Sequence, residues 1–167
     1  MKAYMTSGTI DFLKKIDNEN PELNLYLMTN SEGGMAYYEN NEKKIFSAGR
    51  VFEVVMKTGE ILEEGYVVMN NIPVSDESKP GFEHRFKNQN NIVESMPGFK
   101  AFRLLRPLQG NTYVVFTQWG SSADFENWKD SDQFKEAHKS QAVKQPAYTN
   151  DRPFLTKCTM YIEEEEE

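Results

Sequence analysis

The chain has 167 residues, of which 38% are apolar and 13% aromatic, which suffices for one mid-sized domain with a packed core. Its formal net charge is −7, and five of the negative charges belong to the glutamate run at 163–167, which we expect to be a solvated acidic tail. The remaining charge of −2 is not accompanied by a Lys/Arg cluster. The composition therefore argues against a nucleic-acid partner.

Cysteine content and hydropathy indicate the cellular compartment in which we expect the protein. The single cysteine, Cys158, excludes an internal disulfide and a cysteine-based metal cluster, and it fits a reducing environment. The N-terminus lacks the apolar core of a signal peptide, and no apolar run approaches the ~18 residues of a membrane span. We therefore expect a soluble, cytoplasmic protein without a membrane partner.

Residues 1–62 are predicted to form a β-rich extension. "KAYMTSGT" and "LNLYLMT" are typical of strands, and "IDFLKKID" between them of a short helix. "GGMAYYENNEKKIFSAG" predicts a hairpin that turns at Asn40 and Asn41. "VFEVVMKTG" fits a helix or a strand. No catalytic pattern is visible in this part.

Residues 63–162 predict the order strand, helix, strand, strand, helix, strand, which is the split βαβ arrangement of a ferredoxin-like α+β sandwich. The strands are "YVVMNNIPV", "FKAFRLLRP", "NTYVVFTQW" and "PFLTKCTMYI". The first helix is "SDESKPGFEHRFKNQNNIVESM", with Phe82, Phe86 and Val93 on one face and entry through Ser75 or Ser78.

Two of these strands have apolar residues at consecutive positions, "YVVM" and "YVVF". Consecutive apolar residues indicate that both faces of the sheet are covered. Helices cover one face, so a second sheet is expected on the other. A partner chain or residues 1–62 would supply it and produce a barrel-like assembly.

The second helix, expected over residues 121–142, carries Phe125 and Trp128 on one face and His138 further along. In one straight helix, Trp128 and His138 would lie ~15 Å apart along the axis. "DSD" at 130–132 favours a break and a new helix start, because these residues are good N-caps and poor helix formers. A break allows Trp128 and His138 to share a site, although both residues also suit ordinary structural roles.

Strand alternation places Asn70 on the same face as Tyr66, Val68 and Ile72. Asparagine is depleted in strand interiors, and an unsatisfied buried amide costs ~1–3 kcal/mol. Asn70 is therefore a candidate ligand-orienting group. The alternative is that it marks the end of the strand before Pro73.

These residues resemble the antibiotic biosynthesis monooxygenase (ABM) superfamily and, within it, the haem-degrading monooxygenases of the Isd and Hmo type. The resemblance covers residues 65–162, and with residues 1–62 the chain is similar to the larger Bacillus-type HmoB proteins, some of whose relatives are called TRAP signal-transduction proteins. It rests on the asparagine in "VVMNNIPV", the phenylalanine of "HRF", the strand "MPGFKAFRLLRP", and the pair in "WKDSDQFKEAH".

The resemblance implies roles for particular residues. His138 would ligate haem iron, Asn70 would hydrogen-bond iron-bound dioxygen, and Trp128 would distort the macrocycle. Other contacts to the haem would come from Phe86, Phe125 and Arg85, the last by neutralising a propionate. Because the extra strands change the sheet contact, Asn70 is an alternative iron ligand to His138. His84 is expected to face solvent.

The implied activity is degradation of haem, which serves as substrate and cofactor, with O2 and electrons from an external donor or reductase, since no dinucleotide-binding motif is present. One alternative is a non-catalytic haem-binding or signal-transduction protein. Another is a cofactor-free ABM monooxygenase acting on a small phenolic substrate. We favour a monomer over a homodimer, because residues 1–62 would cover the sheet within one chain.

Overall fold

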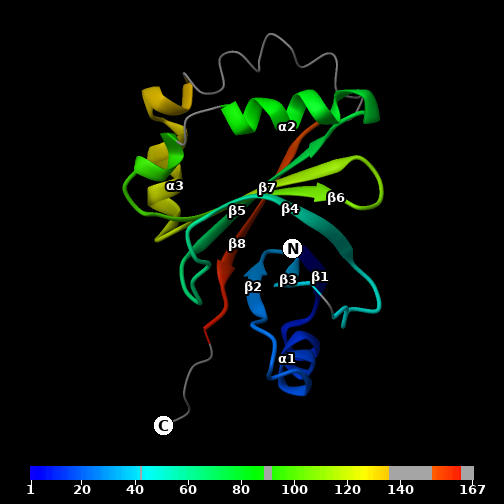
Figure 1. The fold of residues 1–167 in the computed structure, drawn as a ribbon. Coiled ribbons are helices and arrows are strands. Elements are labelled where there is room, and N and C mark those ends of the chain that lie inside the picture. The colour runs from blue at the N-terminus through cyan, green and yellow to red at the C-terminus, as the bar shows by residue number, and fades with distance from the viewer. Residues whose placement is uncertain (42, 89–91, 136–151, 163–167) are drawn as a thin grey trace.

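An eight-stranded closed barrel forms the body of the protein in a computed structural model, which describes all residues except 42, 89–91, 136–151 and 163–167 (Figure 1). The strand order is β1-β3-β2-β8-β5-β7-β6-β4, and β4 pairs with β1 to close the ring. The elements are β1 (Lys2–Gly8), α1 (Ile10–Glu19), β2 (Tyr26–Asn30), β3 (Gly33–Asn40), β4 (Arg50–Thr58), β5 (Tyr66–Pro73), η1 (Asp76–Ser78), α2 (Lys79–Asn88), η2 (Ile92–Ser95), β6 (Phe99–Pro107), β7 (Thr112–Trp119), α3 (Ser122–Lys129) and β8 (Phe154–Met160).

The barrel consists of two halves with the same topology. The N-terminal half, β1 to β4, has the strand order β4-β1-β3-β2, and the C-terminal half, β5 to β8, has the order β8-β5-β7-β6. Each is the antiparallel sheet of a ferredoxin-like fold, and the protein is accordingly of the α+β class. The two halves meet at two seams, β2 with β8 and β4 with β6, so the last strand of each half pairs with the second strand of the other.

The strand registers show that the halves are related by a pseudo-twofold axis. Lys2 pairs with Asn40 at one end of β1, as Tyr66 pairs with Trp119 at the same end of β5. When these pairs are superimposed, the seams match as well. The pair Met28–Met160, between β2 and β8, then falls on the pair Leu105–Val54, between β6 and β4. The repeat therefore extends to individual residue pairs.

Alternate residues of the strands fill the interior with an apolar core, as period-2 alternation requires. Tyr37 and Phe116, which are equivalent in the two halves, stack across the interior with ring centroids 5.0 Å apart. The core residues are Ala3, Met5, Met28, Met35, Tyr37, Phe52, Ile61, Val67, Met69, Ala101, Leu105, Val114, Phe116, Cys158 and Met160. The prediction that a second sheet covers "YVVM" and "YVVF" is confirmed, and the same chain supplies that sheet.

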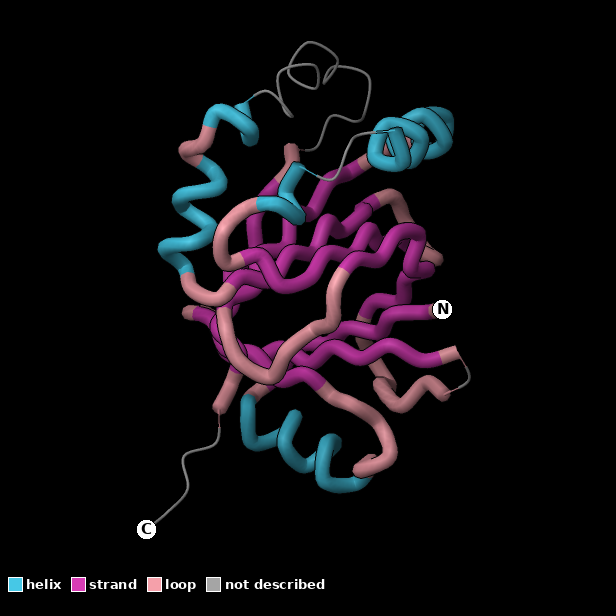
Figure 2. Tube along the Cα trace, turned by 60° about the vertical axis from the view of Figure 1, so that its left-hand side comes forward, coloured by secondary structure: helices cyan, strands magenta, loops and turns pink. Residues whose placement is uncertain are grey.

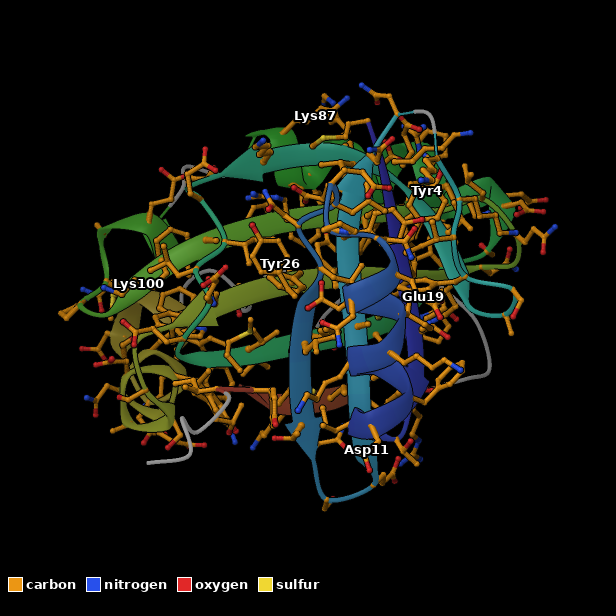
Figure 3. All side chains as sticks on the ribbon, turned by 90° about the horizontal axis from the view of Figure 1, so that it is seen from below. Tyr4, Asp11, Glu19, Tyr26, Lys87 and Lys100 are labelled. Atoms are coloured by element: carbon orange, nitrogen blue, oxygen red, sulfur yellow. The ribbon has the colours of Figure 1, made fainter. Side chains whose placement is uncertain are left out.

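The helices cover the outside of the barrel at two places. In Figure 1, α2 and α3 lie on the side of the C-terminal half and α1 on the side of the N-terminal half, and the view in Figure 2 agrees. Figure 3, seen from below, shows α1 in front of the N-terminal strands, with Asp11 and Glu19 near its two ends. No helix among the described residues is long and apolar enough to cross a membrane.

Two local predictions require correction, and one assignment that the sequence left open is resolved. The hairpin expected at Asn40 and Asn41 is wrong: β3 runs unbroken to Asn40, and the hairpin lies between β2 and β3 instead. The ambiguous segment over 51–59 lies in strand β4, because its pairing with β1 and β6 outweighs local propensity. The helix expected from Ser75 to Met96 is divided: a 3₁₀ turn follows Ser75, α2 spans Lys79–Asn88, and Val93 lies in the separate turn η2.

Candidate functional site

Asn70 lies on the outer face of the C-terminal half, on the strand β5. Its cross-strand neighbours are Val115 on β7 and Leu155 on β8, and its neighbours along the strand on the same face are Val68 and Ile72. The carboxamide is partly buried and makes no hydrogen bond with any described residue. The predicted orientation of β5 is confirmed, and Asn70 is a polar group in an apolar floor.

The first wall beside this floor is α3, which begins with Ser121 as its N-cap. The Ser121 hydroxyl accepts a hydrogen bond from the Asp124 amide and thereby caps the helix. Phe125 and Trp128 are both buried on the inner face of the helix. Trp128 stacks on Trp119 with centroids 6.3 Å apart. The two predicted α3 residues therefore share one apolar cluster, which also contains Val68, two positions from Asn70 on the same strand face.

The predicted helix break is confirmed. α3 ends at Lys129, and residues 132–135 are again helical. The Ser131 hydroxyl donates to the Trp128 carbonyl at 2.6 Å and accepts from the Phe134 amide at 3.1 Å, so one side chain ends the first helix and starts the second. Phe134 meets Trp128 edge-on at 5.4 Å. His138 lies outside the described residues, and its role as iron ligand stays a prediction.

The second wall is α2, which crosses the same face. Phe82 is buried against Tyr113, with centroids 4.7 Å apart, and Phe86 packs beside Phe82 at 5.0 Å. Arg85 is partly buried, whereas His84 is exposed, as expected. The face carrying Phe82 and Phe86 is therefore the one that packs on the sheet, and Arg85 lies at its border.

A buried ionic cluster that the sequence did not reveal anchors α2. The Glu83 carboxylate accepts two hydrogen bonds from Arg106, at 2.8 and 2.7 Å, and one from the Tyr113 hydroxyl. Hydrogen bonding from Arg106 holds the pKa of Glu83 below its ordinary value, despite the opposing effect of burial. Burial and the hydrogen bond to Glu83 raise the pKa of Tyr113. The sequence feature that could have indicated this cluster is Glu83 itself, which follows the buried Phe82 and lies opposite outward-facing polar residues of β6 and β7.

The arrangement joins residues from five elements on one outer face. Asn70 forms its floor, Phe125 and Trp128 belong to one wall, and Arg85 and Phe86 to the other. The described residues contain no cluster of three His, Cys, Asp or Glu side chains able to hold a metal ion. The chemistry this face offers is that of a largely apolar surface with the Asn70 amide in its floor and with the cationic side chains of Arg85 and Lys157 at its border, the latter 5.7 Å from the centre of the Phe125 ring.

Sequence comparison agrees with this class of fold and site. Residues 65–140, which include the floor strand and both walls, match the family described as Antibiotic biosynthesis monooxygenase. The C-terminal half thus resembles an ABM domain in sequence over these residues.

Relatives with the same extent are known. The chain is 26% identical over 142 residues, 85% of each chain, to "Signal transduction protein TRAP" of Staphylococcus aureus. A structure described as a major regulator of staphylococcal pathogenesis has a TM-score of 0.84 and 24% identity, over 96% of this chain and 98% of that one. The heme-degrading enzyme LmHde of Listeria monocytogenes has a TM-score of 0.74 and 22% identity, over 95% and 99%. These two structures establish the likeness of fold over both halves.

Proposed function

We propose that the protein is a haem-degrading monooxygenase whose substrate lies on the outer face of the C-terminal half, between α2 and α3. The observation that carries the proposal is the Asn70 amide, which is partly buried among Val68, Ile72, Val115 and Leu155 without a hydrogen-bond partner in the described part of the chain. Such an amide in an apolar floor is suited to orienting a polar group on a flat apolar ligand.

The residues present fit a haem group. Trp128 is a rigid, buried aromatic group beside the floor that stacks on Trp119, and Phe86 is a second aromatic group on α2. Arg85 supplies positive charge for a propionate. His138, or alternatively Asn70, would provide the iron ligand. A reduced haem iron supplies activation of O2 when bound, and the electrons come from an external donor.

In this mechanism, the residues of the chain bind and orient. Asn70 would donate an N–H to a polar group of the bound ligand and has no acidic hydrogen to give at neutral pH, so it would orient that group without protonating it. Trp128 is fixed by Trp119 and Phe134 and would therefore resist displacement by a bound macrocycle. The walls exclude water from the apolar face.

A second candidate function is haem-dependent signalling without turnover. The observation that favours it is the likeness to relatives named Signal transduction protein TRAP, over most of both chains. Such a protein would use the same floor and walls but keep the haem intact. A cofactor-free monooxygenase acting on a small phenol would instead have no affinity for haem.

One experiment separates these functions: an anaerobic titration with hemin, followed by ascorbate, catalase and air. A saturable Soret band that then decays to a bile-pigment-like spectrum, with iron captured by a chelator, is the result expected of the enzyme. A Soret band that persists in air indicates the signalling function. The absence of any band would overturn the haem proposal and direct the search to small phenols.

We also propose that the protein acts as a monomer. Both seams of the barrel are closed within one chain, so the sheet face that a separate ABM module would leave open is already covered. Sedimentation should give a mass near 19.3 kDa. A mass of twice that value would contradict the proposal.

A further inference from the structure

Asn71, the neighbour of Asn70 on β5, points the opposite way, into the barrel, where its side chain is fully buried. Its amide nitrogen lies near three acceptors: the carbonyls of Met69 at 3.3 Å and Phe154 at 3.2 Å, and the hydroxyl of Thr156 at 3.1 Å. Its amide oxygen accepts a hydrogen bond from Arg50 at 3.2 Å. Both ends of the carboxamide are therefore satisfied, which fixes its orientation.

These contacts act on the surroundings of Asn70. Phe154 and Thr156 are the residues on either side of Leu155, which is the cross-strand neighbour of Asn70 on the outer face. Asn71 thus links β8 to β5 by hydrogen bonds inside the barrel. The floor of the candidate site lies at the same level of these two strands, on the outer face. Because adjacent strand residues share one backbone, a fixed side chain at 71 limits rotation of the strand at 70.

Arg50 comes from β4, in the N-terminal half, and crosses the barrel end to reach Asn71. Its guanidinium also contacts the Met5 sulfur at 3.3 Å and lies 5.5 Å from the centre of the Phe52 ring. Its side chain is partly exposed at this end of the barrel, and it forms no ion pair within the described part of the chain. Arg50 is held here by an amide, a thioether and an aromatic ring. These contacts orient Asn71 and do not neutralise a carboxylate.

We propose that Arg50 and Asn71 are positioning residues for Asn70, and that through them the N-terminal half determines the geometry of the candidate site. Arg50 and Thr156 occupy equivalent strand positions in the two halves, so the Asn71 carboxamide is bound from both sides by the pseudo-symmetric pair. This inference rests on the proposed function only for the role of Asn70 toward haem. The mechanical coupling of Arg50 to Asn70 is a property of the haem-free protein.

The coupling is tested first without haem, by NMR of the ¹⁵N-labelled protein. The side-chain NH2 signals of Asn70 are assigned by their loss in Asn70→Asp. Arg50→Met removes the hydrogen bond to Asn71 but keeps an unbranched side chain on Phe52, and it is expected to shift the Asn70 signals. Lys2→Met, which removes an exposed charge from the same half, is the matched control and should leave them in place. Unchanged Asn70 signals in Arg50→Met would overturn the inference.

The functional consequence is measured on the haem-loaded protein. Arg50→Met and Asn71→Ser are expected to bind hemin within about threefold of the original affinity, to turn it over roughly tenfold more slowly, and to change the ratio of tetrapyrrole isomers, as removal of outer-sphere partners does elsewhere. A purely structural role would lower the melting temperature and leave the isomer ratio unchanged. Turnover and isomer ratio equal to those of the unsubstituted protein would refute the positioning role alone. Failure of the unsubstituted protein to bind hemin would refute the proposed function, while the NMR result would still decide the coupling.

Discussion

The two halves of the barrel share strand order, register and seams, but their outer faces differ. At the position equivalent to Val68, the N-terminal half has Tyr4, which stacks on Tyr38 with ring centroids 4.7 Å apart, and Phe46 closes over Tyr38 at 5.1 Å. The Tyr38 hydroxyl is satisfied by Lys43 and Ile45. The C-terminal half has Val68 and Thr117 at the positions of Tyr4 and Tyr38, and its strand aromatics Tyr113 and Trp119 pack against aromatic residues of the helices α2 and α3.

This difference teaches how one topology provides either a packed face or a site. In the N-terminal half, large side chains rise from the strands themselves and meet a loop, so aromatic rings fill the space above the sheet. In the C-terminal half, the equivalent loop is replaced by α3, and the rings of Phe125 and Trp128 approach from the side of the floor. The aromatic residues of the N-terminal half therefore fill the face that in the C-terminal half carries the candidate site.

The largest expected effect concerns Asn70 and its counterpart. Thr6 occupies the equivalent position in the N-terminal half, paired with Ala36 as Asn70 is with Val115. Asn70→Ala should lower haem turnover ~100-fold or more, as loss of one oriented donor does in other active sites, with hemin affinity largely kept. Thr6→Ala should leave turnover unchanged. Turnover is measured by decay of the Soret band. If Asn70→Ala retains turnover, the outer faces of the two halves do not differ in function through Asn70.

The second effect concerns the aromatic wall. Trp128→Ala should lower the free energy of unfolding by about 3–4 kcal/mol, because a buried indole leaves a cavity beside Trp119. Phe46→Ala should cost about 3 kcal/mol in the other half and leave haem turnover intact. Denaturant titration and turnover assays on both variants check this.

Trp128→Phe keeps an aromatic ring and should slow ring oxidation more than it weakens binding. An unaltered rate of ring oxidation would assign Trp128 to packing alone.

The third effect depends on pH. The lowered pKa of Glu83 means that its ion pair stabilises the folded protein above the ordinary carboxyl value of 4.5 and is lost as pH falls through the lower folded-state pKa. Glu83→Gln should lower stability by about 1–2 kcal/mol at neutral pH, a figure reduced for the partly exposed Arg106. The deficit should shrink as pH falls below 4.5 and disappear once the pH is below the folded-state pKa of Glu83. A deficit that stays constant into acid would show that the charge of Glu83 is not what anchors α2.

The smallest effect is at the helix break. Ser131→Ala removes both hydrogen bonds of the side chain and should cost about 1 kcal/mol, as expected for loss of an N-cap. Because Ser131 also orients Phe134 against Trp128, the Soret maximum of the hemin complex should shift slightly. Ser131→Thr, which keeps a hydroxyl, is the control. Identical spectra for Ser131→Ala and the control would confine this residue to helix capping.

Local pattern was sufficient to predict the strands of the C-terminal half and the strand or helix faces of Asn70, Phe125 and Trp128, but not the division of the helix predicted over 75–96. Alternation along "YVVMNNIPV" placed Asn70 outward, the i, i+3 spacing put Phe125 and Trp128 on one face, and "DSD" marked the helix break. The family resemblance supplied the chemical roles. The hairpin at Asn40 and Asn41 failed because a turn dipeptide does not show where a strand finds its partners, and β3 is held to its end by β1.

The sequence by itself therefore determined the order of elements, the faces of the strands and the residues proposed for chemistry, because each depends on contacts within a few residues. Only the tertiary structure decided that the two halves form one barrel with matching registers, since no repeat is visible in the sequence. It also decided the partners of Glu83 and Asn71. Arg106 and Arg50 lie more than twenty positions away from them, and the burial that makes these contacts strong exists only after the sheet has closed.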